Sequence, residues 1–232
     1  MRIATFTNDG HPEAAIRHNE TYIPLSRINV ELETDWLVSL KPLLDSGRFG
    51  DLTHWYTENT GRLDQVEGIP VEEAAVGPLY RDPAKIWGIG LNYADHAGDL
   101  DENVPEGLPG SFLKPATTLI GPGDEVQIPV MSERTTGEGE LGIIFGQTCK
   151  DVPQQKWQDV VAGFTTIIDM TAEDILRRNP RYLTNGTMEN RPQRCEHHIA
   201  LSVIDVEAID NACRVVLVVN LSHLSPVKPT LQ

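Results

Sequence analysis

The stretches GEGELGIIFG (residues 137–146) and VVAGFTTIID (residues 160–169) hold the clearest β-strand patterns in the chain. Each is a short run rich in apolar residues, and this pattern is typical of a strand. In the first stretch Glu138 and Glu140 are one residue apart, so on a strand both side chains point to the same face. In the second stretch Asp169 ends the apolar run. An acid at the end of a buried strand is well placed to act as a ligand at the edge of a sheet.

These three carboxylates indicate a cation site. Two like charges held side by side repel each other unless a cation neutralises them or one carboxylate takes up a proton. Three oxygen donors suit Mg²⁺, with Mn²⁺ and Ca²⁺ as further candidates. We therefore expect Glu138, Glu140 and Asp169 to converge on one divalent ion. On spacing alone, exposed glutamates on the solvent face of an edge strand explain the same pattern.

The segments before these strands predict two domains. Residues 1–30 have the pattern of short antiparallel strands, and leucines at helical spacing predict one or two helices within residues 31–65. A connecting stretch with three prolines follows. We expect a small N-terminal domain over residues 1–75 and a larger metal-binding domain over residues 85–232.

Further elements are expected inside the larger domain. SFLKPATTLIGPGDEVQIP (residues 111–129) predicts a strand, a Gly-Pro-Gly turn and a second strand. TAEDILRRN (residues 171–179) predicts a helix in which Thr171 and Asp174 form a capping box. RVVLVVNLS (residues 214–222) predicts one more strand.

The composition limits the classes of protein that fit. Of 232 residues 40% are hydrophobic, which is enough for a packed core, and the formal net charge is −15. Such a charge repels a phosphate backbone, so nucleic-acid binding is not expected. Three cysteines form no disulfide framework, the first residues are too polar for a signal peptide, and no apolar run approaches a membrane span. A cytoplasmic protein that contacts no membrane is expected.

A polar segment, residues 94–111, is long for a connection and is typical of a lid or binding loop. It contains His96 and, three residues later, Asp99. A carboxylate beside an imidazole orients it and raises its basicity, which suits a general base. A surface histidine in an acidic loop explains the same pair. Two other patterns are weaker: Cys195-x-His197-His198 lacks the second ligand pair of a zinc site, and Gly88-x-Gly90 lacks the third glycine of a dinucleotide loop.

Taken together and in order along residues 85–184, the segments KIWGIGLNYADHAGD, SFLKPATTLIGPGDEVQIP, GEGELGIIFG and VVAGFTTIIDMTAEDILRRNPRYLT resemble the fumarylacetoacetate hydrolase family. The resemblance implies an α+β, β-rich fold: a mixed β-sandwich or roll with a small N-terminal β/α domain, forming a homodimer. It implies a Mg²⁺-type ion held by Glu138, Glu140 and Asp169. Substrates would be 2-oxo or diketo acids that undergo C–C hydrolysis, decarboxylation, hydration or keto–enol isomerisation. His96 matches the family's general base, and Asp99 stands where a glutamate commonly partners it.

The chain departs from the family pattern after its metal aspartate. Hydrolytic members commonly carry Arg and Gln where this chain has Glu173 and Leu176. A substrate-polarising lysine that normally follows soon after the RYLT segment is replaced by Asn185-Gly186-Thr187, and the family's Gly-Thr-rich closing segment is not found. Three hypotheses follow: an active metal-dependent enzyme, a metal-binding homologue with weak catalysis because its pocket is incomplete, or a binding module without metal chemistry.

Overall fold

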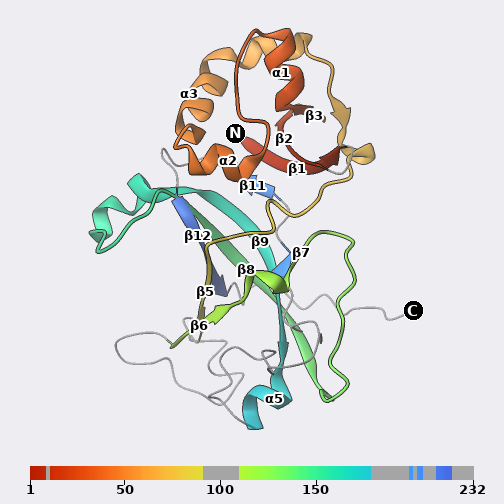
Figure 1. Cartoon of the computed structure of the whole chain (residues 1–232), viewed down its shortest axis with the longest axis vertical. Helices are drawn as coiled ribbons and strands as arrows, with labels where there is room; N and C mark the ends of the chain where they lie inside the picture. Colours follow the sequence, from red (N-terminus) through yellow and green to blue (C-terminus); the bar gives the residue numbers. More distant parts are fainter. Residues whose placement is uncertain (9–10, 91–109, 179–198, 201–202, 206–212, 221–232) are drawn as a thin grey trace.

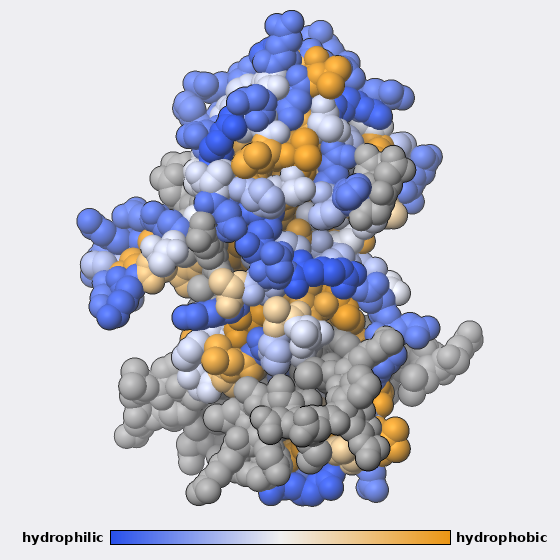
Figure 2. Space-filling view, viewed as in Figure 1, coloured by the Kyte–Doolittle hydropathy of each residue, from blue (hydrophilic) through white to orange (hydrophobic). Residues whose placement is uncertain are grey.

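The computed structural model describes residues 1–8, 11–90, 110–178, 199–200, 203–205 and 213–220. The first part of the chain forms a small antiparallel unit with helices packed around it (Figure 1). Its elements are β1 (Arg2–Asn8), β2 (His11–His18), β3 (Thr21–Pro24), α1 (Leu25–Glu31), α2 (Leu40–Asp45), α3 (Phe49–Asn59), the 3₁₀ helices η1 (Thr60–Gln65) and η2 (Val71–Glu73), and β4 (Ile69–Pro70). The strands and helices predicted for residues 1–65 are thus present, and Figure 2 shows mainly hydrophilic residues over this unit.

The rest of the described chain is mostly strand. It contains β5 (Lys85–Gly90), β6 (Gly110–Lys114), η3 (Ala116–Thr118), β7 (Leu119–Ile120), β8 (Thr135–Gly146), η4 (Gln154–Val160), β9 (Val161–Ala172), α5 (Glu173–Arg178), β10 (Ile199–Ala200), β11 (Val203–Asp205) and β12 (Cys213–Asn220). In the described part of the chain, no helix is long and apolar enough to span a membrane.

All the strands belong to one mixed sheet. Its main path runs β4-β3-β2-β1-β11-β9-β8-β12-β5-β6, and β10 joins β7 to β9 at the side. The strand predicted for residues 214–222 is β12, which lies between β8 and β5 in the middle of the sheet. The β12–β5 pairing is parallel while the β8–β9 and β8–β12 pairings are antiparallel, so the predicted mixed, β-rich α+β architecture is confirmed.

The main apolar cluster of the described residues is centred in the N-terminal unit and extends onto one face of β8 and β9. Residues along β8 alternate in burial from Glu138 onward, as expected when one face is covered. Ile144 on β8 and Ile167 on β9 belong to the same apolar cluster as Ile3 and Ile23 of the N-terminal unit. The face of β8 that carries Glu138 thus continues into the core a few residues later.

Two expectations about local structure were wrong. Residues 124–129 form no strand; Gly123 has a φ of +82°, and the Asp124 carboxylate accepts hydrogen bonds from the backbone N–H of Gly121 and from Arg81 instead. Thr171 does not cap a helix, because it lies within β9 opposite Thr136 and α5 begins only at Glu173. Because α5 begins at Glu173, the residue directly before the helix is Ala172, and Thr171 is one position too early to act as its N-cap.

Candidate metal centre

The three predicted ligands lie on one face of the β8–β9 ladder. Glu138 is directly opposite Asp169, and Glu140 is opposite Ile167, one step further along the same face. Glu140 and Asp169 are 5% and 3% exposed, and Glu138 is half-buried. Asp169 also pairs with Ile199 of β10, so its strand has a neighbour on both sides. The register, rather than the end of an edge strand, brings these carboxylates together and removes them from water.

A buried lysine, which the sequence reasoning did not select, lies beside these carboxylates. Lys114 ends β6, and its ammonium forms an ion pair with Asp169 Oδ1. The side chains of Lys114 and Asp169 are 6% and 5% exposed. Lys114 Nζ also donates a hydrogen bond to the carbonyl of Met170 at 3.2 Å and lies 5.7 Å from the centre of the Phe112 ring.

Curvature of the sheet explains how Lys114 reaches Asp169. On the main path β6 is separated from β9 by β5, β12 and β8. At a strand spacing of about 4.8 Å, four steps across a flat sheet would cover roughly 19 Å, well beyond the reach of a lysine. The sheet must therefore curl, with the carboxylate face on the inside. The pairings of β7 with β10 and of β10 with β9 close that curve.

Burial and charge act in opposite directions on the pKa values of this pair. Burial lowers the pKa of Lys114, and the negative charges of Asp169, Glu138 and Glu140 partly restore it. Burial raises the pKa of Asp169, and the ammonium of Lys114 opposes that rise. Each charge in this site is therefore maintained by its neighbours rather than by water.

The donor set is chemically suited to a divalent cation. With all four groups ionised, three carboxylates and one ammonium leave a charge of −2, and every carboxylate donor is a hard oxygen of the kind that Mg²⁺, Mn²⁺ and Ca²⁺ accept. Within the described residues, however, no group of three or more His, Cys, Asp or Glu side chains is arranged around a common metal position. As the side chains lie, Asp169 contacts Lys114, and the three carboxylates do not converge on one point.

The helix after β9 is tied to the segment that leads into β8. The Asp174 carboxylate accepts hydrogen bonds from Ser132 Oγ at 2.7 Å and from the backbone N–H of Glu133 at 3.1 Å. These bonds, with a weaker contribution from Arg178, lower the pKa of Asp174 to about 2. The start of β8 and the end of β9 are thereby tied together, at the end of the pair that carries Glu138 and Asp169.

Glu173, the first residue of α5, is held by two arginines. Its carboxylate lies 2.5 Å from Arg134 Nε and 2.5 Å from Arg177. Two cationic side chains, Arg134 and Arg177, therefore lie at the end of the β8–β9 pair that carries Glu138 and Asp169.

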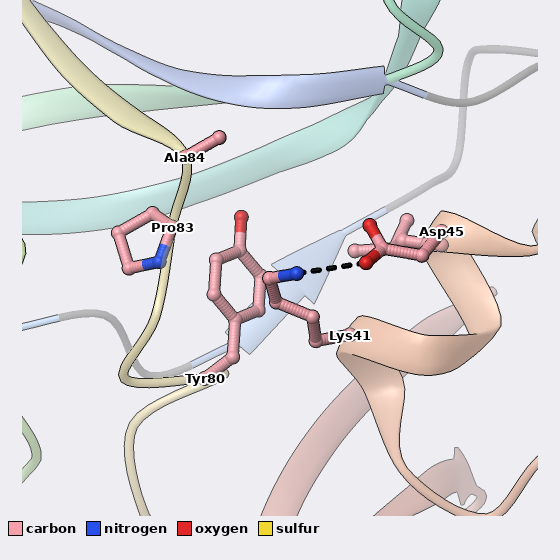
Figure 3. Close-up of a pocket in the computed structure, with 6 residues that line it drawn as sticks. Lys41, Asp45, Tyr80, Pro83 and Ala84 are labelled. Carbon is pink, nitrogen blue, oxygen red and sulfur yellow. Dashed lines mark hydrogen bonds and ion pairs between the residues drawn. The ribbon is translucent and has the colours of Figure 1, made fainter.

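The structure also contains a shallow cavity, open to solvent, between α2 and residues 80–84 (Figure 3). It is lined by Lys41, Leu44, Asp45, Tyr80, Pro83 and Ala84. Lys41 is engaged by Asp45 at 2.8 Å and faces Asp82 at 3.8 Å. None of the three carboxylates lines this cavity, and its one cation is already neutralised, so it is not the candidate centre.

The remaining predicted site residues, His96 and Asp99, lie outside the described residues, as do Cys195, His197 and His198. Their roles stay predictions. The signal that could have found Lys114 was a lysine at the end of an apolar strand, directly before Pro115. That signal is weak, because Asp169, the partner of Lys114, is 55 positions away in sequence.

Comparison with known families identifies the family of this chain. The model of the fumarylacetoacetate (FAA) hydrolase C-terminal domain matches residues 85–222, and the match extends beyond Thr184. Because this covers more than half of the chain, the protein belongs to the fumarylacetoacetate hydrolase family. An uncharacterized protein of Archaeoglobus fulgidus is 39% identical over 100 residues, and a putative hydrolase of Burkholderia ambifaria is 38% identical over 123 residues. These alignments cover 43% and 53% of this chain but only 40% and 42% of the relatives, so the chain spans about two-fifths of their length.

Solved structures share the fold. A maleylpyruvate hydrolase from Sphingobium sp. SYK-6, in complex with manganese(II) and pyruvate, superposes with a TM-score of 0.60 at 21% identity, covering 89% of this chain and 67% of that one. A 5-carboxymethyl-2-hydroxymuconate delta-isomerase from Mycobacterium smegmatis gives 0.55 at 19% identity, covering 90% and 68%. At such identities the likeness shows the fold alone.

Proposed function

We propose that the protein is a divalent-metal-dependent enzyme that acts on a 2-oxo or diketo acid, with Glu138, Glu140 and Asp169 as ligands of a Mg²⁺ or Mn²⁺ ion. The observation that carries the proposal is the β8–β9 register, which sets Glu138 opposite Asp169 with Glu140 on the same buried face. The maleylpyruvate hydrolase that shares this fold contains manganese and pyruvate, a 2-oxo acid, and this supports the same class of ligand here.

Each residue has a distinct task in this proposal. The three carboxylates hold the ion, and Lys114 keeps Asp169 oriented on the inner face of the sheet. When bound, the ion would be chelated by the 2-oxo acid and would offset the negative charge that develops as a bond to the adjacent carbon breaks. His96 would remove a proton from water or from the substrate, and Asp99 would orient its imidazole.

Which of hydrolysis, decarboxylation, hydration and isomerisation the enzyme would catalyse depends on the substrate that it binds. The second hypothesis, a metal-binding homologue with slow chemistry, rests on the family resemblance, which places Glu173 where hydrolytic members commonly carry arginine. It predicts that metal binding is retained while turnover stays far below the common range of about 1–10³ s⁻¹. A homodimer and a cytoplasmic location also remain predictions.

The test combines metal titration and turnover on one preparation. Mn²⁺ binding is measured by calorimetry, and turnover of oxaloacetate, an acylpyruvate and fumarylacetoacetate is followed with Mg²⁺ or Mn²⁺. E138Q and E140Q should each weaken Mn²⁺ binding more than about tenfold, since one unit charge at about 4 Å contributes about 4 kcal/mol at an effective dielectric constant near 20. Glu125 is exposed, so E125Q is the matched control.

Two results would overturn the proposal. One is wild-type protein that binds neither Mn²⁺ nor Mg²⁺ and turns over none of the panel. The other is Mn²⁺ binding that E138Q and E140Q leave unchanged, because the ion would then be held elsewhere.

A further inference from the structure

Lys114 brings an ammonium group into the proposed metal centre, where orienting Asp169 is the only task so far assigned to it. A cation site built only to attract a metal would exclude a lysine. Here the ammonium forms an ion pair with Asp169, one of the three proposed ligands, and the side chains of both residues are about 5% exposed. The charges of Glu138 and Glu140 also act on it.

The surroundings of Lys114 leave its ammonium little freedom to withdraw. Nζ donates to the Met170 carbonyl at 3.2 Å, and the Phe112 ring, 5.7 Å away, lies under it on the same face of β6. Gly88 of the neighbouring strand has the Phe112 ring packed on its Cα, where a Cβ would lie 2.1 Å from the ring. The ring is thereby held against the sheet, and the side chain of Lys114 is enclosed between strands.

The presence of this ammonium changes the charge that an incoming ion meets. Three ionised carboxylates alone carry −3, a charge that a trivalent ion balances. With Lys114 in place the charge is −2, which a divalent ion balances. The repulsion between the ammonium and the ion grows in proportion to the charge of the ion. The ammonium therefore lowers the affinity for a trivalent ion more than the affinity for a divalent ion.

We propose that Lys114 is a specificity-determining residue of this site: it stays paired with Asp169 when the ion binds, and its charge makes the site select divalent over trivalent cations. This rests on the proposed metal site. Removing the charge should raise the affinity for both classes of ion, by a factor that grows with the charge of the ion. A lysine that merely competed for Asp169 and moved away would instead change both affinities by one common factor.

The experiment uses the whole chain with Mn²⁺ and Tb³⁺ alone as probes. Mn²⁺ affinity is measured by calorimetry and Tb³⁺ affinity by its luminescence, so no enzymatic activity is needed. K114M should bind Mn²⁺ about tenfold or more tightly than the wild type and should gain at least another tenfold for Tb³⁺. K114R keeps the charge and should keep the wild-type ratio of the two affinities. Lys85 is exposed on the adjacent strand β5, so K85M is the matched control and should change neither affinity.

K114M can fail to fold without metal, because it leaves three carboxylates close together. K114Q then carries the same test, since its amide can still donate to Asp169. Equal gains for Mn²⁺ and Tb³⁺, unchanged affinities or weaker binding of both ions would each overturn the role assigned to Lys114. Wild-type protein that binds neither ion would instead overturn the metal site itself, so the two failures are distinguishable.

Discussion

Replacing Asp169 by asparagine tests the buried ion pair directly, in protein kept free of metal with a chelator. The change keeps the size of the side chain but leaves the ammonium of Lys114 facing a neutral amide. Both side chains are about 5% exposed, so water does not replace the lost charge. Breaking a buried pair by removing one partner costs about 3–5 kcal/mol. The charges of Glu138 and Glu140 act on the same ammonium, so we expect a value near the lower end, about 3 kcal/mol.

The loss is measured as the free energy of unfolding in urea and as the melting temperature. For a chain of this size 1 kcal/mol corresponds to about 2–4 °C, so D169N should melt roughly 6–12 °C below the wild type. Asp159 is exposed, and D159N should change the melting temperature by less than about 2 °C.

A double-mutant cycle separates the pair from its surroundings. D169N leaves the ammonium of Lys114 without its partner, and K114M leaves the carboxylate of Asp169 without its partner. The double variant removes both charged groups. The double variant should therefore be more stable than the sum of the two losses predicts, by about 1–3 kcal/mol. Additive losses, or a D169N variant within 1 kcal/mol of the wild type, would refute the reasoning that this pair is buried and coupled.

Three further predictions follow from separate parts of the chain. G88A should lower the melting temperature and weaken Mn²⁺ binding, because the new Cβ would lie 2.1 Å from the Phe112 ring and displace the ring toward Lys114. G61A is the control, since its Cβ meets nothing within 4 Å. Equal effects of the two substitutions would contradict this prediction. The folded-state pKa of Asp174 is about 2, below its ordinary 3.8, so its contribution is fully present above pH 3.8 and is lost as pH falls toward 2. The melting temperature of the wild type should therefore fall more steeply than that of D174N between about pH 4 and pH 2, and parallel curves would rule this out. H96A should lower turnover of a genuine substrate by about 10²–10⁴-fold with little change in Mn²⁺ affinity; unchanged turnover would remove His96 from the mechanism.

Local patterns in the sequence were sufficient for most of the elements. Alternating and continuous apolar runs predicted β8, β9 and β12, and leucines at helical spacing predicted the helices of the N-terminal unit. These patterns succeed because burial of one face imposes a period on the chain itself. The strand expected over residues 124–129 failed, because apolar residues that find no partner strand form none.

For the candidate centre, the sequence by itself determined that Glu138 and Glu140 share a face, since a strand has a period of two. Only the tertiary structure decided that Asp169 stands opposite Glu138, because register depends on the pairing of two strands and not on either alone. Only the curl of the sheet decided that Lys114, from a strand four steps away, enters the same site. The charge of the centre, and with it the class of ion that fits, therefore depends on a contact that no local pattern contains.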